Sequence, residues 1–151
     1  MANSQAMCTS FKGEILSGVH ALGTTVIRAG TGADTLKAAL YLASSSQGAG
    51  TTAYGVSGEV SGTGYSAGGV TITNANAPAT SGTTGYWTPS ASFTYTTVTL
   101  TTAFDAVLVY NSTQSNKAIS VHTFQSQSIT AGTFTLTMPT SDATNALIRI
   151  A

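Results

Sequence analysis

The sequence predicts an all-β domain, an antiparallel β-sandwich or a jelly-roll-like fold, with one N-terminal helix. Three observations indicate this class. About eight or nine short stretches rich in valine, threonine and aromatic residues follow one another, with turn residues roughly every ten positions. Apolar and polar residues alternate within most of these stretches, as strands with one buried face require. Only one stretch, near the N-terminus, has apolar residues at helical spacing.

Composition limits the size of the domain and the kind of partner it can have. The chain has 151 residues, no formal net charge and only 7% charged residues, against about 25% in typical domains. This length suits one domain with a core of its own. The lysine and arginine residues are scattered, so we expect no binding patch for nucleic acid. The low charge either favours association between copies or simply reflects a β-rich soluble fold.

Cysteines and targeting signals are sparse. Cys8 is the only cysteine, which excludes an intrachain disulfide and a cysteine-based zinc site. The N-terminus lacks the basic and then apolar pattern of a signal peptide, and no apolar run approaches the ~20 residues of a membrane helix. We therefore expect synthesis in a cytoplasm and no membrane partner.

We expect an N-terminal arm over residues 1–9 and a single domain over residues 10–151. Alternation and turn residues predict strands at 24–28, 36–42, 54–60, 70–74, 93–100, 104–110, 117–124, 133–138 and 147–150, with loops at 43–53 and 75–85. In the strand over 93–100 the phase of the apolar positions slips near Thr96 and Thr97. This slip predicts a β-bulge or a bend between sheets.

The helix is expected over residues 10–22. Phe11 and Ile15 belong to an apolar stripe at helical spacing, and Lys12 falls off it. Two glycines weaken the helix by about 1 kcal/mol each relative to alanine, so it has to pack against something. It packs either on its own domain or on a neighbour, and in the second case Phe11, Lys12 and Ile15 are the contacts.

The rest of the chain is organised around a hairpin over residues 104–124. Its first strand is apolar on both faces, because Val107 and Val109 alternate with other apolar residues and only Asp105 is charged. Such a strand is either central in a sandwich or covered by another subunit. In the second case Val107 and Val109 would form the contact between subunits.

The sequence carries no motif that predicts an enzyme, a metal site or a cofactor. His20 and His122 are far apart, and neither has a carboxylate at metal-ligand spacing. A Ser-His-Asp triad could be assembled on paper from His122 and Asp105, but a triad is a geometry that a serine-rich composition does not specify. The glycines over 62–69 match a dinucleotide loop only loosely, because β-type sequence follows them where a helix should stand.

Four stretches share their pattern with a known family. They are MCTSFKGEILSGVH at 7–20, DTLKAALYLASSS at 34–46, TTAYGVSGEVSGTGYSAGGVTIT at 51–73 and DAVLVYNSTQSNKAISVHTF at 105–124. The chain resembles, nearly from end to end, small virion proteins of tailed bacteriophages that are encoded near the major capsid protein. These proteins are often labelled capsid decoration or cement proteins, and sometimes tail-fibre proteins. The family has no active-site residues to carry over.

The resemblance implies a structural virion protein on the capsid exterior, made in the host cytoplasm. It would bridge subunits of the major capsid protein and stabilise the shell, and it would associate with itself as a dimer or trimer. The alternative is a virion-surface or tail-fibre-associated module that binds host carbohydrate. Tyr65, Tyr86 and Trp87 on predicted loops favour this alternative, because exposed aromatic rings stack on sugars. An aromatic pair such as Tyr86 and Trp87 is, however, more often the lid of a core than a binding contact.

Overall fold

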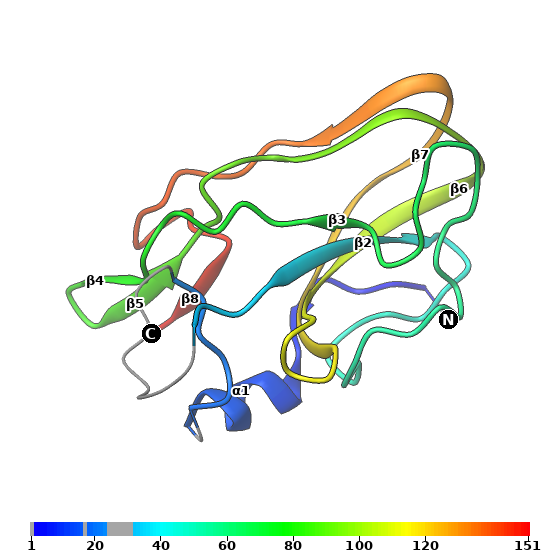
Figure 1. Cartoon of the computed structure of the whole chain (residues 1–151). Helices are drawn as coiled ribbons and strands as arrows, with labels where there is room; N and C mark the ends of the chain where they lie inside the picture. The colour runs from blue at the N-terminus through cyan, green and yellow to red at the C-terminus, as the bar shows by residue number, and fades with distance from the viewer. Residues whose placement is uncertain (1, 17, 24–31) are drawn as a thin grey trace.

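The computed structural model describes residues 2–16, 18–23 and 32–151, without the side chains of 12–14 and 16. Its elements are β1 (Ala6–Met7), α1 (Thr9–Leu16), β2 (Leu36–Leu42), β3 (Val70–Thr71), β4 (Ala79–Ser81), β5 (Thr84–Trp87), β6 (Phe93–Asn111), β7 (Lys117–Leu136) and β8 (Ile148–Ile150). They form a five-stranded antiparallel sheet in the order β1-β7-β6-β2-β3 and a three-stranded antiparallel sheet in the order β4-β5-β8 (Figure 1). The prediction of an all-β fold with two antiparallel sheets and one N-terminal helix is confirmed.

The two longest strands, β6 and β7, form one continuous hairpin of 19 and 20 residues. The predicted strands 93–100 and 104–110 are a single strand, because bulges rather than turns absorb the changes of phase. The register shifts between Tyr95 and Val98, and Thr97 between them has a φ of 54°, so the predicted bulge is confirmed. Figure 1 shows the far part of this hairpin arching above β2 and β3.

The second half of β6 is buried on both faces. β6 lies between β7 and β2 in the sheet. Val107 is 2% exposed and Val109 is 0% exposed, and Leu108 and Tyr110 on the opposite face are buried as well. Elements of the chain itself therefore cover both faces, which makes the strand central in the sandwich. Val107 and Val109 are core residues of the single chain and present no surface to a second subunit.

The N-terminal arm packs across its own domain. β1 adds to the edge of β7, and the backbone N–H of Cys8 donates to the carbonyl of Ile119 at 3.0 Å. The side chain of Asn3 donates to the carbonyl of Leu42 at 3.1 Å and accepts from the backbone N–H of Gln47 at 2.8 Å. These hydrogen bonds fix the arm on the domain rather than leaving it extended.

The helix α1 is shorter than the predicted helix over 10–22. It ends at Leu16, and Gly18 follows with a φ of 66°. This left-handed conformation favours glycine and turns the chain out of the helix, and the Gly18 N–H donates to the carbonyl of Ile15 at 3.0 Å. Phe11 is 0% exposed, so the helix packs on its own domain.

Three further predictions concern the connections between the long strands. Residues 54–60, all of them described, form no strand and are held by isolated contacts with β2. Residues 75–85, predicted as a loop, contain β4 and the start of β5. Gly82, with a φ of 57°, allows the tight turn between them, and the polar composition concealed this hairpin. The predicted strand over 24–28 lies outside the described residues.

One face of the large sheet is covered by residues 54–69, which we call the tyrosine cover. Glu59 holds this segment together, since its carboxylate accepts hydrogen bonds from the hydroxyls of Tyr54 and Tyr65 and from the backbone N–H of Gly68. All three donor–acceptor distances are 2.7 Å. Glu59 is only 9% exposed, and these charge-assisted bonds offset the desolvation of its carboxylate.

Tyrosines of the sheet itself complete the tyrosine cover. The ring of Tyr110 stacks on the ring of Tyr54 with 4.7 Å between centroids, and its hydroxyl donates to the carbonyl of Gly68 at 2.8 Å. The hydroxyl of Tyr41 donates to the carbonyl of Gly55 at 2.6 Å. The hydroxyls of Tyr41 and Tyr110 therefore each bond a backbone carbonyl of the segment that lies on them.

Candidate functional site

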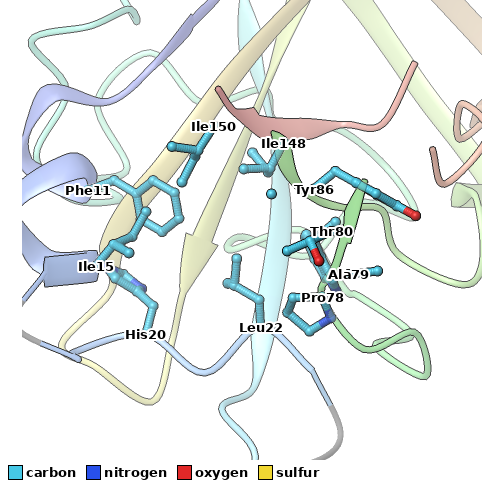
Figure 2. Close-up of a pocket in the computed structure, with 12 residues that line it drawn as sticks. Phe11, Ile15, His20, Leu22, Pro78, Ala79, Thr80, Tyr86, Ile148 and Ile150 are labelled. Carbon is cyan, nitrogen blue, oxygen red and sulfur yellow. The ribbon is translucent and has the colours of Figure 1, made fainter. Parts of the chain in front are cut away.

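The opposite face of the large sheet carries the candidate site. Asn111 follows Tyr110 on β6 and so points to this face, where its side-chain nitrogen lies 3.1 Å from Nδ1 of His20. A cavity of about 290 Å³ opens here, between α1 and the three-stranded sheet (Figure 2). We call it the apolar pocket. Its lining residues are Phe11, Ile15, His20, Leu22, Pro78, Ala79, Thr80, Gly85, Tyr86, Trp87, Ile148 and Ile150.

The three-stranded sheet supplies one wall of the apolar pocket. Its register places Thr80 opposite Gly85, Gly85 opposite Ile150, and Trp87 opposite Ile148, so these residues share one face. Figure 2 shows Ile148 and Ile150 on the pocket side of β8. Gly85 has no side chain in the middle of this wall. A Cβ at this position would approach only the carbonyl oxygen of Ile150, at 3.9 Å, so the missing side chain helps to keep the pocket open.

The helix α1 and the segment after it supply the other wall. The ring of Phe11 meets the imidazole of His20 edge to face, with 4.7 Å between centroids. Behind them, the buried carboxylate of Asp34 accepts hydrogen bonds from the side-chain nitrogen of Asn111 at 2.8 Å and from the backbone N–H of Ala21 at 2.7 Å. This polar network anchors the segment after α1 to the end of β6 and thereby fixes the wall.

The aromatic residues predicted as sugar contacts are mostly engaged within the chain. Trp87 is 1% exposed, and its indole N–H donates to the carbonyl of Asn76 at 3.1 Å. The ring of Tyr65 stacks on Tyr95 with 5.9 Å between centroids. Tyr86 is half-buried, and its hydroxyl points away from the pocket in Figure 2. Trp87 is therefore buried as the lid of a core, and one ring face of Tyr65 is taken by Tyr95.

The apolar pocket offers contact surface rather than reactive groups. Among the described residues, its lining includes no carboxylate, lysine, arginine or cysteine. Ile150, which is 48% exposed, extends the apolar surface to the outside. An open, uncharged cavity of this kind suits an apolar side chain from another molecule.

The predicted partner contacts separate into three groups. Those that line the apolar pocket are Phe11, Ile15, Tyr86 and Trp87. The side chain of Lys12 lies outside the described residues. Val107 and Val109 lie in the core. The structure thus brings the contacts predicted on the helix and on the aromatic pair to one place, although they are far apart in the sequence.

Sequence reasoning did not predict Ile148 and Ile150 as contacts. Residues 147–150 were predicted only as a last strand. Alternation along a strand places Ile148 and Ile150 on one face. Nothing in the local pattern indicated that this face lies against α1, because that placement depends on contacts between the two ends of the chain.

Asp105 and His122, from which a Ser-His-Asp triad could be assembled, bond different partners in the structure. Asp105 accepts a hydrogen bond from the side chain of Asn3 at 2.5 Å. Nε2 of His122 lies 2.8 Å from the hydroxyl of Ser120. In the part of the chain that the structure describes, no group of three or more His, Cys, Asp or Glu side chains could hold a metal ion.

Comparisons with known proteins give no relative: no family model, no curated protein and no solved structure matches the chain. Within the described ranges, none of the helical structure is long and apolar enough to span a membrane. The apolar pocket is therefore interpreted from its own residues.

Proposed function

We propose that this chain is a structural protein of a tailed-bacteriophage virion, which lies on the outside of the capsid and holds the major capsid protein through the apolar pocket. The pocket carries the proposal, because it joins residues from distant parts of the chain into one uncharged surface cavity. The sequence resemblance supports the assignment of the chain to a virion. The low charge suits many copies packed side by side without accumulated repulsion.

The occupant we assign to the apolar pocket is an apolar side chain of the major capsid protein. The walls carry no carboxylate, lysine or arginine among the described residues, so a lysine, arginine or carboxylate side chain would lose its hydration without forming an ion pair with one of these groups. Burial of one side chain the size of leucine stabilises a contact by roughly 1.5–3 kcal/mol. Repeated over the many copies on a shell, contacts of this size stabilise the assembled capsid by linkage.

Co-sedimentation of the purified protein with capsids that lack it tests the proposal. We expect the protein to pellet at a fixed stoichiometry and the decorated shells to survive a higher temperature. Gly85→Val adds a side chain to the middle of the pocket wall, where a Cβ has room, and should weaken binding by about tenfold or more. Gly50→Val is the matched control, because Gly50 is exposed and has nothing within 4 Å of an added Cβ.

The outcomes separate the two parts of the proposal. A wild-type protein that stays in the supernatant would overturn the capsid role, and binding of host carbohydrate would become the leading function. A wild-type protein that pellets together with both valine variants, at equal affinity, would keep the capsid role and remove the apolar pocket as its contact.

A further inference from the structure

A second cavity, of about 390 Å³, lies between the N-terminal arm, β7 and the segment that leads into β8. We call it the polar cavity. Its lining consists of residues 5–7, 120–122, 139 and 145–149, and unlike the apolar pocket it is formed mainly by polar groups. Its volume falls within the roughly 300–1,000 Å³ of small-molecule sites, which is more space than a single side chain needs.

Two side chains of the polar cavity come from opposite ends of the chain. Gln5 and Arg149 are both exposed and both line the cavity. Within the described residues, neither side chain makes a hydrogen bond or an ion pair. An amide and a guanidinium with unused donors therefore stand at one opening, and a ligand can use them without breaking an existing contact.

Further hydrogen-bonding groups stand beside them. Nε2 of His122 is occupied by the hydroxyl of Ser120 at 2.8 Å, which leaves Nδ1 for a ligand. The side-chain nitrogen of Asn145 donates to both carboxylate oxygens of Asp142, at 3.1 and 3.0 Å, which leaves the amide oxygen of Asn145 as an acceptor. These groups can bond the hydroxyls of a polar molecule.

The charge of the polar cavity selects among polar molecules. Arg149 is the only charged residue in the described lining, which contains no carboxylate. Burial lowers the pKa of His122 to about 4, so its imidazole is neutral at neutral pH. The lining therefore has one positive charge among neutral hydrogen-bonding groups, and the carboxylate of Asp142, which is not part of the lining, is held by the Asn145 amide. A guanidinium matches a carboxylate through two parallel bonds, so the complementary ligand has one carboxylate and several hydroxyls.

We propose that the polar cavity binds a sugar acid, whose carboxylate pairs with Arg149 and whose hydroxyls bond Gln5, His122 and Asn145. This binding goes beyond the proposed capsid contact, since the two cavities share only Ile148 in their linings. A sugar acid can arrive as a free monosaccharide or as one unit of an acidic polysaccharide. Both sources present the same carboxylate and hydroxyls.

Titration of the isotope-labelled full chain by NMR, with sodium glucuronate as the probe, tests this inference. We expect saturable shifts in residues 5–7, 120–122 and 145–149, and at least about tenfold weaker binding of glucose and of acetate. Arg149→Gln should lower the affinity for glucuronate about tenfold or more. Lys37→Gln is the matched control, because it removes the same charge from the face under the tyrosine cover and should leave the affinity unchanged.

Three results would overturn the inference: no saturable shift with glucuronate, equal binding of acetate, or an Arg149→Gln variant that folds and keeps its affinity. If Arg149→Gln does not fold, Gln5→Ala replaces it, and an affinity that stays within twofold of the wild type has the same meaning. The affinity for an oligosaccharide that contains glucuronate is measured last. Tighter binding than the monosaccharide identifies a polymer as the source, and equal binding identifies the free acid.

Discussion

The two covers of the large sheet use different chemistry. The buried carboxylate of Glu59 holds the tyrosine cover together, and hydroxyl hydrogen bonds of Tyr41 and Tyr110 join it to the sheet. The cover formed by α1 and the three-stranded sheet depends on apolar contacts of residues such as Phe11, Trp87 and Ile148. Hydrogen bonds are directional and fix one geometry, whereas apolar contacts are not directional and leave room for a cavity. The apolar pocket accordingly lies on the apolar side.

High pH should break the tyrosine cover, and this is the largest effect we expect. Burial raises the pKa of Tyr41 and of Tyr110 from 10.0 to about 12, and burial also raises the pKa of Tyr54, Tyr65 and Tyr95. Because the folded pKa values lie above 10.0, the unfolded chain loses protons first. The free energy of unfolding should therefore stay level below about pH 10 and fall by several kcal/mol toward pH 12, on the order of the whole stability of a domain.

Tyrosinate absorbance and circular dichroism, followed in one alkaline titration, check this expectation. We expect most of the tyrosine ionisation to occur in one cooperative step that coincides with loss of the β-sheet signal. A gradual ionisation centred near pH 10, with the β-sheet signal intact, would mean that the hydroxyls are free in water and that the tyrosine cover is not closed.

Trp87→Ala should destabilise the cover formed by α1 and the three-stranded sheet, with the second largest effect that we expect. The indole is 1% exposed and forms part of the pocket wall, so its removal should lower the free energy of unfolding by about 3–5 kcal/mol. Urea unfolding measures the loss. Tyr86→Ala is the matched control, because Tyr86 is the half-buried neighbour and should lose clearly less. Equal losses for the two variants would show that Trp87 is not packed as described.

The sequence predicted local features of this fold better than contacts between distant residues. Alternation predicted β2 correctly, and the slip of phase near Thr97 predicted its bulge, because both signals lie within a few neighbouring residues. The tyrosine cover gave no such signal. Tyr54, Glu59 and Tyr65 lie in one irregular segment, and Tyr41 and Tyr110, which bond this segment, are distant in the sequence.

The apolar pocket also depends on contacts between distant residues that local patterns did not predict. Phe11 and Trp87 were each recognised as candidate contacts from their local surroundings. Their meeting at one pocket depends on a three-stranded sheet built from two separate parts of the chain. One of these parts, the hairpin around Gly82, looked like a polar loop in the sequence, so no local pattern could assemble the wall.

Glu59→Gln tests the hydrogen bonds of the tyrosine cover with almost no change in side-chain shape. The carboxylate accepts bonds from Tyr54, Tyr65 and the Gly68 backbone, whereas a glutamine presents an amide N–H₂ in place of one oxygen and opposes a donor with a donor. We expect urea unfolding to show a loss of about 1–3 kcal/mol, less than for Trp87→Ala.

A double-mutant cycle with Tyr54→Phe shows whether that loss comes from the hydrogen bond. The hydroxyl of Tyr54 donates to the carboxylate of Glu59 at 2.7 Å, so the two substitutions remove the same interaction and their effects should fall short of additivity by at least about 0.5 kcal/mol. If the effects simply add, or if Glu59→Gln changes stability by no more than the roughly 0.5 kcal/mol of an ordinary surface substitution, ring packing rather than the carboxylate holds the tyrosine cover. The two covers would then share one chemistry. The larger volume of the apolar pocket, about 290 Å³ against about 160 Å³ for the cavity beside Tyr65, would have to come from the missing side chain at Gly85.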